Sequence, residues 1–502
     1  MTSTRKRVRR AAGRTLRSLG IEPPWTVGRE NARPGTDGWR VRRPGPDRAV
    51  EGYADRLAVD PGESFRLFVS TTAASFRIEA YRMGWYGGKQ GRLVWRSEEV
   101  PGRLQPEAKV EDPYWTVVAP WEPSTTVPTR GWPEGCYLLK LVSAEGFERW
   151  VPITVRSRST AGKLVMVNAT STWQAYNRWG GGWNIYGGPG GSVDDYERRS
   201  RKVSLDRPYD KNGSYFNWYE LPLLSLAEQL GLPLGYATDH DLHARPELFR
   251  RCRGLVFGGH DEYWTSGMRE TVLRVRDSGG NLAFFGANTA YRHVRFEPST
   301  LGLGEDRVMT CFKRAEEDPF LESNPDEATQ QWRLPPNPRP ESEICGVQYE
   351  SNPCDAPFVV TEPDAWLFAG TGAVKGSSYG RLIRVEYDKL FTDVPVPRPI
   401  QVLSDSPLVC RGTSTYANSC YYTSPSGAGV FSTGTLGWTP ALPLGGYRKQ
   451  NPPETCRFTE QVTKNVLQEF ARGPVGRRHP AVDNYQEYAR PFPEDMPYSW
   501  EF

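Results

Sequence analysis

The stretch GLVFGGHDEYWTSGMRETVLRVRDSGGNLAFFGANTAY (254–291) decides the fold. Two short apolar runs, 254–259 and 281–286, each end in glycine. Between them, residues 266–280 carry apolar side chains at helical spacing and stop at a pair of glycines. This pattern predicts a strand, a helix and a second strand that runs parallel to the first.

The same alternation of strand and helix extends on both sides of this unit. We therefore expect one parallel sheet, covered by helices on both faces and carrying loop-rich insertions, over residues 158–502. The predicted strands are 163–170, 234–239, 380–387 and 427–438, and the predicted helices are 220–231, 244–252 and a closing helix at 459–472.

Residues 48–157 have a different pattern, with apolar residues at every second position. Four such runs, separated by turn-forming Gly and Pro, predict a small β-sandwich of immunoglobulin-like type. The runs are 64–71, 75–82, 136–143 and 150–156. Residues 1–47 are basic and rich in Pro and Gly, which is typical of an extended lead-in.

Charge and hydropathy exclude several classes of function. The net charge is +4, but residues 1–20 hold seven Arg or Lys and no acid, so the rest of the chain is slightly acidic. A basic surface for nucleic acid is therefore not expected on the folded body. No apolar run is long enough to span a membrane, and the basic start lacks the apolar stretch of an export signal, so we expect a cytoplasmic protein.

Eight cysteines are scattered without any CxxC pair, which argues against a zinc ribbon or a redox motif. Cys345 with Cys354 and Cys410 with Cys420 are close enough in sequence for disulfides in an exported protein. In a cytoplasm, free buried thiols are expected instead.

Polar side chains follow three of the predicted strands. Tyr176 and Tyr186 follow the first, His260 and Glu262 follow the third, and Asn288 follows the fourth. Because ligands bind at the carboxyl ends of parallel strands, we expect these segments to converge on one crevice. His240, His243, Asp239 and Asp241 are interpreted as polar or capping residues at the start of a helix.

The residue at the end of the fourth strand, Asn288, indicates whether the chain has a covalent nucleophile. Asn288 stands where a nucleophilic Cys would sit on a sharp turn, and a GxSxG motif is absent, so covalent acyl transfer is not expected. The remaining side chains are rich in oxygen, and phenolate oxygen suits a hard ferric ion better than zinc. Tyrosines in glycine-rich loops also serve as packing residues, so this pattern alone leaves a metal site open.

Five motifs in this order resemble the carboxyl-terminal domain of the N,N-dimethylformamidase large-subunit family. They are ATSTWQAYN (169–177), NIYGG (184–188), TDHDLH (238–243), GGHDEYW (258–264) and GANTAY (286–291). The resemblance implies a sandwich module followed by an amidotransferase-like (flavodoxin-like) α/β domain. It also implies one mononuclear, ferric iron ion per chain, held by two tyrosines and a glutamate.

Carried over motif by motif, the resemblance assigns Tyr176 and Glu262 as metal ligands and Tyr186 as the second tyrosine. Tyr196, Tyr215 and Tyr219 remain alternatives for that ligand, because the loop between the two tyrosines is shorter here than in the family. His260 and Asn288 fall at positions beside the ligands that contact substrate. Asp261 stands where the family has proline.

The resemblance implies hydrolysis of a carbon–nitrogen bond in a small, non-peptide amide by metal-activated water. His260, whose ordinary pKa is about 6.5, would be the base, and Asn288 would donate to the oxyanion. A small partner subunit is implied by the family, and a homo-oligomer is possible. The alternative is a non-catalytic protein that binds a carbohydrate or polymer, for which bound metal is the discriminating measurement.

Overall fold

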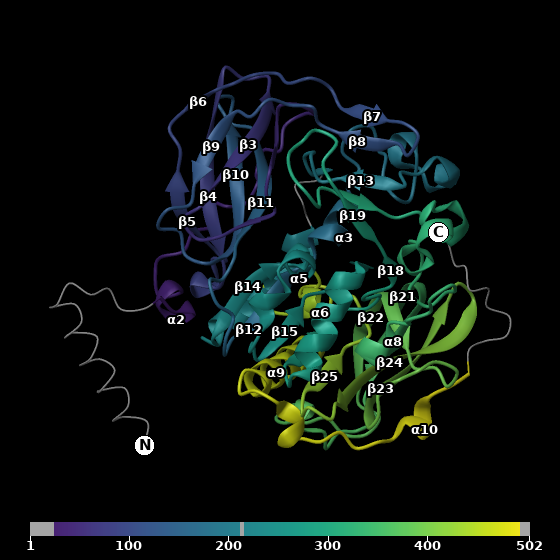
Figure 1. Ribbon diagram of the computed structural model, residues 1–502. Coiled ribbons are helices and arrows are strands. Elements are labelled where there is room, and N and C mark those ends of the chain that lie inside the picture. Colours follow the sequence, from purple (N-terminus) through teal and green to yellow (C-terminus); the bar gives the residue numbers. More distant parts are fainter. Residues whose placement is uncertain (1–24, 211–214, 492–502) are drawn as a thin grey trace.

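The computed structural model describes residues 25–210 and 215–491 (Figure 1). Residues 1–20, whose basic composition bears on partners, lie outside the described residues. No helix in the described part of the chain is long and apolar enough to cross a bilayer. The described cysteines are all thiols, and the Cys420 thiol donates to the Cys345 carbonyl at 3.4 Å.

Two sheets, antiparallel except for one parallel strand pair, form the amino-terminal part, at the upper left of Figure 1. Most residues of their longer strands are buried, and Phe65, Ile78 and Leu139 from the two sheets meet in one apolar core. One sheet has the order β1 (Val50–Ala54), β3 (Ser64–Thr71) and β9 (Thr125–Pro128). The other has β2 (Ala58–Val59), β11 (Glu148–Val155), β10 (Gly135–Ser143), β4 (Ser75–Met83) and β5 (Gly91–Arg96), with β6 (Val100–Pro101) on β4.

A seven-stranded sheet forms the centre of the second part. Its first five strands are parallel, and its last two are antiparallel to their neighbours. The five parallel strands are short, mostly apolar and buried along their whole length, as the sequence predicts for a parallel sheet. In order across the sheet, the seven strands are β14 (Leu234–Thr238), β12 (Leu164–Asn168), β15 (Gly254–Phe257), β17 (Asn281–Phe284), β25 (Gly429–Ser432), β24 (Thr413–Thr423) and β23 (Ile400–Cys410).

Helices cover both faces of this sheet. On one face, α4 (Leu221–Gln229) and α9 (Pro453–Phe470) share a core with Val256 and Ala283. On the other face, α5 (Asp239–Ala244) and α6 (Ser266–Asp277) pack with alternate residues of the same strands. The Thr265 hydroxyl caps α6 by accepting from the Met268 amide at 3.2 Å.

One predicted helix is wrong. The segment 244–252 is not an α-helix; α5 lies immediately before it, at Asp239–Ala244, and only a short turn follows at Pro246–Phe249. Thr238 and Asp241 form a capping box that starts the helix earlier, and Pro246 cannot continue it. Asp241 is therefore a capping residue, as the sequence indicated. His240 and His243 lie within α5.

Shorter elements complete the chain, and the predicted lead-in is not wholly extended. It contains α2 (Val27–Glu30) and the buried Trp39, which stacks on Trp150. The small sheets are β13 (Lys202–Ser204) with β20 (Val308–Thr310) and β19 (Arg295–Glu297); β16 (Tyr263–Trp264) with β18 (Arg292–His293); β21 (Gln348–Val359) with β22 (Ser378–Lys389); and β7 (Lys109–Glu111) with β8 (Thr116–Val118). The short helices are α3 (Thr170–Ala175), α7 (Phe320–Ser323), α8 (Ser342–Cys345) and α10 (Tyr485–Tyr488).

A buried ion pair connects the two parts. Arg82 of β4 lies 2.7 Å from Glu228 of α4, and both side chains are fully buried. The Tyr236 hydroxyl of β14 donates to Glu228 at 2.6 Å, so three elements meet at one carboxylate.

Candidate metal centre

The site lies where the strand order reverses. β14 lies on one side of β12, while β15 and the later parallel strands lie on the other. At such a reversal, the segments that leave two adjacent strands diverge and open a crevice at their carboxyl ends. β12 leads through α3 to Tyr176, and β15 leads to His260 and Glu262.

Three oxygen-bearing side chains meet in this crevice. The Tyr176 hydroxyl donates to Glu262 Oε2 at 2.7 Å, and the Tyr186 hydroxyl lies 3.2 Å from both Glu262 oxygens. The two hydroxyl oxygens are 2.8 Å apart. The structure thus brings together the two tyrosines and the glutamate that the sequence selects as ligands.

Local hydrogen bonds hold each of these residues in place. The Glu262 amide donates to the Thr172 hydroxyl at 3.0 Å, which ties the loop after β15 to α3. The Arg292 amide donates to the Glu262 carbonyl at 2.9 Å. On the other loop, the Tyr186 amide donates to the Asn184 side chain at 2.8 Å.

The geometry also distinguishes Tyr186 from the other tyrosines that could be the second tyrosine ligand. Tyr215 stacks on the Tyr176 ring at 5.3 Å between centroids, and Tyr219 lies 6.5 Å from the His260 ring. The Tyr196 ring lies under the Arg199 guanidinium, 4.1 Å from it. Among these four tyrosines, Tyr186 is the one for which the described residues show a hydrogen bond to Glu262.

His260 and Asn288 line the same crevice, together with a residue that the sequence analysis missed. His260 Nε2 lies 3.4 Å from the Tyr176 hydroxyl and 3.3 Å from Glu386 Oε2. The Asn288 side chain lies close enough to the Glu386 carboxyl group to lower its pKa, against the larger effect of burial. Glu386 belongs to β22, far along the chain, and its only signal in the sequence is an acid within the apolar run 380–387.

Burial sets the protonation of these groups. It raises the pKa values of Tyr176 and Tyr186 well above 10, and the Glu262 carboxylate raises them further. It also raises the pKa of Glu386 well above 4.5, with Glu262 as the second cause. Burial lowers the pKa of His260, against a smaller opposing effect of Glu262. Burial therefore favours the neutral form of both the His260 imidazole and the Glu386 carboxyl group.

The donor set fits a hard cation. Oxygen ligands about 2 Å from an ion lie about 3 Å from one another, close to the separations observed here. Several buried polar atoms around the crevice lack a hydrogen-bond partner among the described residues, which points to a missing ligand or solvent. They are His260 Nδ1, Asp261 Oδ2, Asn288 Oδ1, Glu386 Oε2 and the Nε and Nη1 atoms of Arg292.

A cluster of conventional metal ligands is absent from the described residues. No group of three or more His, Cys, Asp and Glu side chains there is arranged to hold an ion. The set around Glu262 contains two phenols, which suit a ferric ion and not a zinc ion.

Strained backbone surrounds the crevice. Asn288 and Ala290 both have φ of 55°, and Val385, next to Glu386, has φ of 68°. Such conformations cost about 1–3 kcal/mol each and are typical of functional sites. The sharp turn predicted at Asn288 is thus present in the structure.

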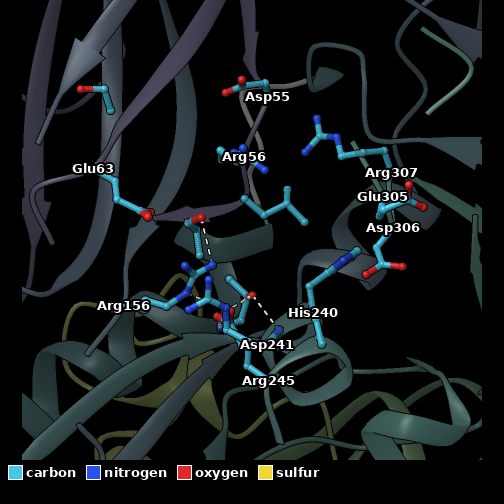
Figure 2. A pocket seen from close by; sticks show the side chains of 15 residues that line it. Asp55, Arg56, Glu63, Arg156, His240, Asp241, Arg245, Glu305, Asp306 and Arg307 are labelled. Carbon is cyan, nitrogen blue, oxygen red and sulfur yellow. Dashed lines mark hydrogen bonds and ion pairs between the residues drawn. The ribbon is translucent and has the colours of Figure 1, made fainter. Parts of the chain in front are cut away.

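A different cavity lies between the sandwich and α5 (Figure 2). Its volume is about 610 Å³, and Arg156, His240 and Asp241 are among its lining residues. Within this cavity, Arg156 lies 2.9 Å from Asp241. None of the predicted ligands lines this cavity.

Comparison with known proteins identifies a family. Residues 77–453 match the family model described as N,N-dimethylformamidase beta subunit-like, C-terminal. The chain belongs to this family. The match includes the motifs that carry Tyr176, Glu262 and Asn288, together with the strand that carries Glu386.

Two relatives are the N,N-dimethylformamidase beta subunits of an Alcaligenes species and of Paracoccus aminophilus. Each is 23% identical over 320 residues, which cover 55% of this chain and 40% of the relative. The matched region thus spans less than half of each relative's length. A solved Paenibacillus cycloisomaltooligosaccharide glucanotransferase is 14% identical over 26% of this chain and 17% of its own, and its TM-score of 0.14 carries no argument about the fold.

Proposed function

We propose that this protein hydrolyses a carbon–nitrogen bond in a small, non-peptide amide, with a ferric ion held by Tyr176, Tyr186 and Glu262. One observation carries the proposal: in a buried crevice, the two tyrosine hydroxyl oxygens lie within 3.2 Å of each other and of the Glu262 carboxylate. Membership of the dimethylformamidase-like family supports an amide as the substrate class. When bound, the ion supplies Lewis-acid polarisation of the amide carbonyl.

The residues around the ligands have the properties that amide hydrolysis requires. His260 is neutral, because burial lowers its pKa, so its imidazole can accept a proton from an attacking water. Burial raises the pKa of the Glu386 carboxyl group, which lies 3.3 Å from His260, and so favours the protonated form that could donate a proton to the leaving nitrogen. The Asn288 amide group donates to a carbonyl oxygen as it gains negative charge.

The architecture supports the same proposal. Numbered along the chain, the five parallel strands lie in the order second, first, third, fourth, fifth, which supports the flavodoxin-like arrangement. The shared core of the two amino-terminal sheets supports the immunoglobulin-like sandwich. A second subunit is compatible with the word beta in the relatives' names.

The second candidate function is carbohydrate binding without catalysis. A cavity of about 760 Å³ is lined by Trp121, Trp179 and charged residues that include Arg178 and Asp210, which is a composition suited to sugar rings and hydroxyls. Tight binding of a glycan by iron-free, inactive protein would favour this function over amide hydrolysis.

A substrate screen tests the proposed function. Iron-loaded protein is incubated with N-alkyl formamides and acetamides, and the released amine is measured. We expect turnover that falls in His260→Ala and is unchanged in Cys252→Ser, whose side chain lies away from the crevice. Absence of amine release from every amide, by protein that retains its iron, would contradict the proposal.

A further inference from the structure

A fully buried arginine contacts residues 174–186, the tyrosine loop, which carries both tyrosines of the candidate centre. Arg207 is 1% exposed, and the hydrogen bonds of its guanidinium group to the described residues all go to backbone carbonyls. Burial lowers the pKa of Arg207 to about 10, against the smaller effects of Asp210 and Tyr209, so the side chain stays charged at neutral pH. A buried charge that bonds to carbonyls uses its hydrogen bonds to fix the backbone.

The carbonyls that accept these hydrogen bonds flank the two tyrosines. They belong to Gln174, Asn177, Trp179 and Trp183. Arg207 Nη2 donates to the first two, at 3.4 and 3.1 Å, and these lie on either side of Tyr176. Arg207 Nη1 donates to the other two, each at 3.4 Å, and these precede Tyr186. One guanidinium group thus connects the turn after α3 to the turn that leads to Tyr186.

The stretch between Trp179 and Trp183 needs such a connection. It consists of Gly180, Gly181 and Gly182, whose φ values are 84°, 99° and 92°. Glycine has the greatest backbone freedom of any residue, so this stretch does not fix its own conformation. Because the carbonyls at its two ends both bond to Arg207 Nη1, the arginine sets the distance that the glycines span.

The segment around Arg207 is held by the same loop in return. Asn177 Nδ2 donates to the Pro208 carbonyl at 2.8 Å, and the Asp210 amide donates to Asn177 Oδ1 at 2.9 Å. A side chain of each segment therefore bonds to the backbone of the other. Arg207 thus has a fixed position relative to Tyr176, which directly precedes Asn177.

We propose that Arg207 is a positioning residue, which sets the separation of the Tyr176 and Tyr186 hydroxyl groups and thereby the affinity of the candidate centre for a ferric ion. Its hydrogen bonds go to the backbone on either side of these ligands, so it acts through the loop. The part that concerns iron rests on the proposed function; the part that concerns the loop does not.

Iron binding by Arg207→Lys tests the proposal. Lysine keeps the positive charge, but its donors lie on a single nitrogen instead of a planar fork, so it cannot reach all of these carbonyls. Iron affinity is measured by competition with a chelator, using full-length protein. We expect it to fall about 10–100-fold, as for other residues that orient metal ligands. The visible absorbance per bound iron should also fall, because a displaced tyrosine no longer contributes to the charge-transfer band.

Hydrogen–deuterium exchange of chelator-treated protein tests the loop without any metal. In Arg207→Lys, the amides of the tyrosine loop should exchange faster than in the wild type, while those of α9 should not change. Arg269→Lys is the matched control, because Arg269 is also fully buried but bonds to the Pro340 carbonyl and the Glu343 carboxylate. It should change neither the exchange of the tyrosine loop nor the absorbance per iron, whatever its effect on thermal unfolding.

Unchanged loop exchange in folded Arg207→Lys, or iron affinity and absorbance per iron equal to those of the wild type, would overturn the proposal. Equal changes in the two lysine variants would also overturn it, because a general loss of stability would then explain them. If Arg207→Lys does not fold, the metal-free wild type decides. The Gly182 amide, which donates to the Arg178 carbonyl at 3.0 Å, should exchange slowly there, and fast exchange would overturn the proposal.

Failure of the proposed function has a different result. The wild type would then take up no iron or release no amine from any amide. The exchange of the tyrosine loop in chelator-treated wild type and Arg207→Lys would still decide whether Arg207 fixes the loop.

Discussion

His260 Nε2 lies 3.3 Å from Glu386 Oε2 next to Tyr176, and burial favours the neutral form of both side chains. This pairing depends on the insertion that contains β21 and β22, which brings Glu386 over the carboxyl end of β15. A base and an acid with different protonation states are what hydrolysis of an amide needs at neutral pH.

Glu386→Gln should lower kcat while the protein retains its iron. The amide of glutamine cannot donate a proton to a leaving amine as the carboxyl group can, and general acid–base residues contribute about 10²–10⁴-fold to rate. Steady-state kinetics and metal analysis on the same preparation check this. Glu305→Gln, at an exposed acid in another cavity, is the control. Loss of iron in Glu386→Gln would mean that Glu386 is a ligand.

Asn288→Ala should lower kcat about 10²–10³-fold, with iron retained, because one donor to the oxyanion is removed. No acyl-enzyme should form, since Asn288 occupies the place of an elbow nucleophile. Rapid-mixing kinetics should show no burst, and added hydroxylamine should not capture an acyl group. A trapped hydroxamate derived from a protein-bound acyl group would contradict direct attack by water.

The Arg82–Glu228 pair should be among the strongest links between the sandwich and the sheet. Glu228→Gln leaves a buried guanidinium without its charge partner, and breaking such a pair costs about 3–5 kcal/mol. Thermal unfolding should show the loss. The double variant Arg82→Met with Glu228→Gln should recover part of it, because no unpaired charge remains. Equal losses in the single and double variants would show that the two residues do not interact.

Asp388 should make stability depend on pH. Burial raises its folded pKa to about 7, so the folded protein binds more protons than the unfolded chain between the ordinary carboxyl pKa and 7. Its contribution to stability is therefore present at low pH and is lost as pH rises through this range. Denaturant unfolding of wild type and Asp388→Asn from pH 4.5 to 7.5 checks this, and the difference between them should change by up to about 4 kcal/mol. The same pH dependence of the unfolding free energy in wild type and Asp388→Asn would contradict this prediction.

The sequence predicted the regular part of this molecule because its signals are local. The apolar runs 163–170, 254–259 and 281–286 are strands since they are short, continuous and bounded by turn residues, and the helix 266–280 has a clear amphipathic period. The helix expected at 244–252 was wrong because the capping box at Thr238 outweighs the propensities that follow it.

The residues of the candidate site likewise include some that the sequence predicts and some that it does not. His260 and Glu262 follow β15, and Tyr176 follows β12 through the short helix α3, so their convergence could be predicted. Glu386 lies in an insertion whose course depends on packing against distant elements. A buried acid in a strand has no periodic signal, and only the folded chain shows where it lies.

Iron content and the visible absorption spectrum of wild type, Glu262→Gln and His260→Ala test the central claim most directly. We predict about one iron per wild-type chain and a visible charge-transfer band from tyrosinate bound to ferric iron. Glu262→Gln should lose most of the metal and the band, because an anionic ligand is removed, while His260→Ala should keep both. A colourless wild-type protein that takes up no iron, or equal loss of metal in the two variants, would contradict the assignment of Tyr176, Tyr186 and Glu262 as ligands.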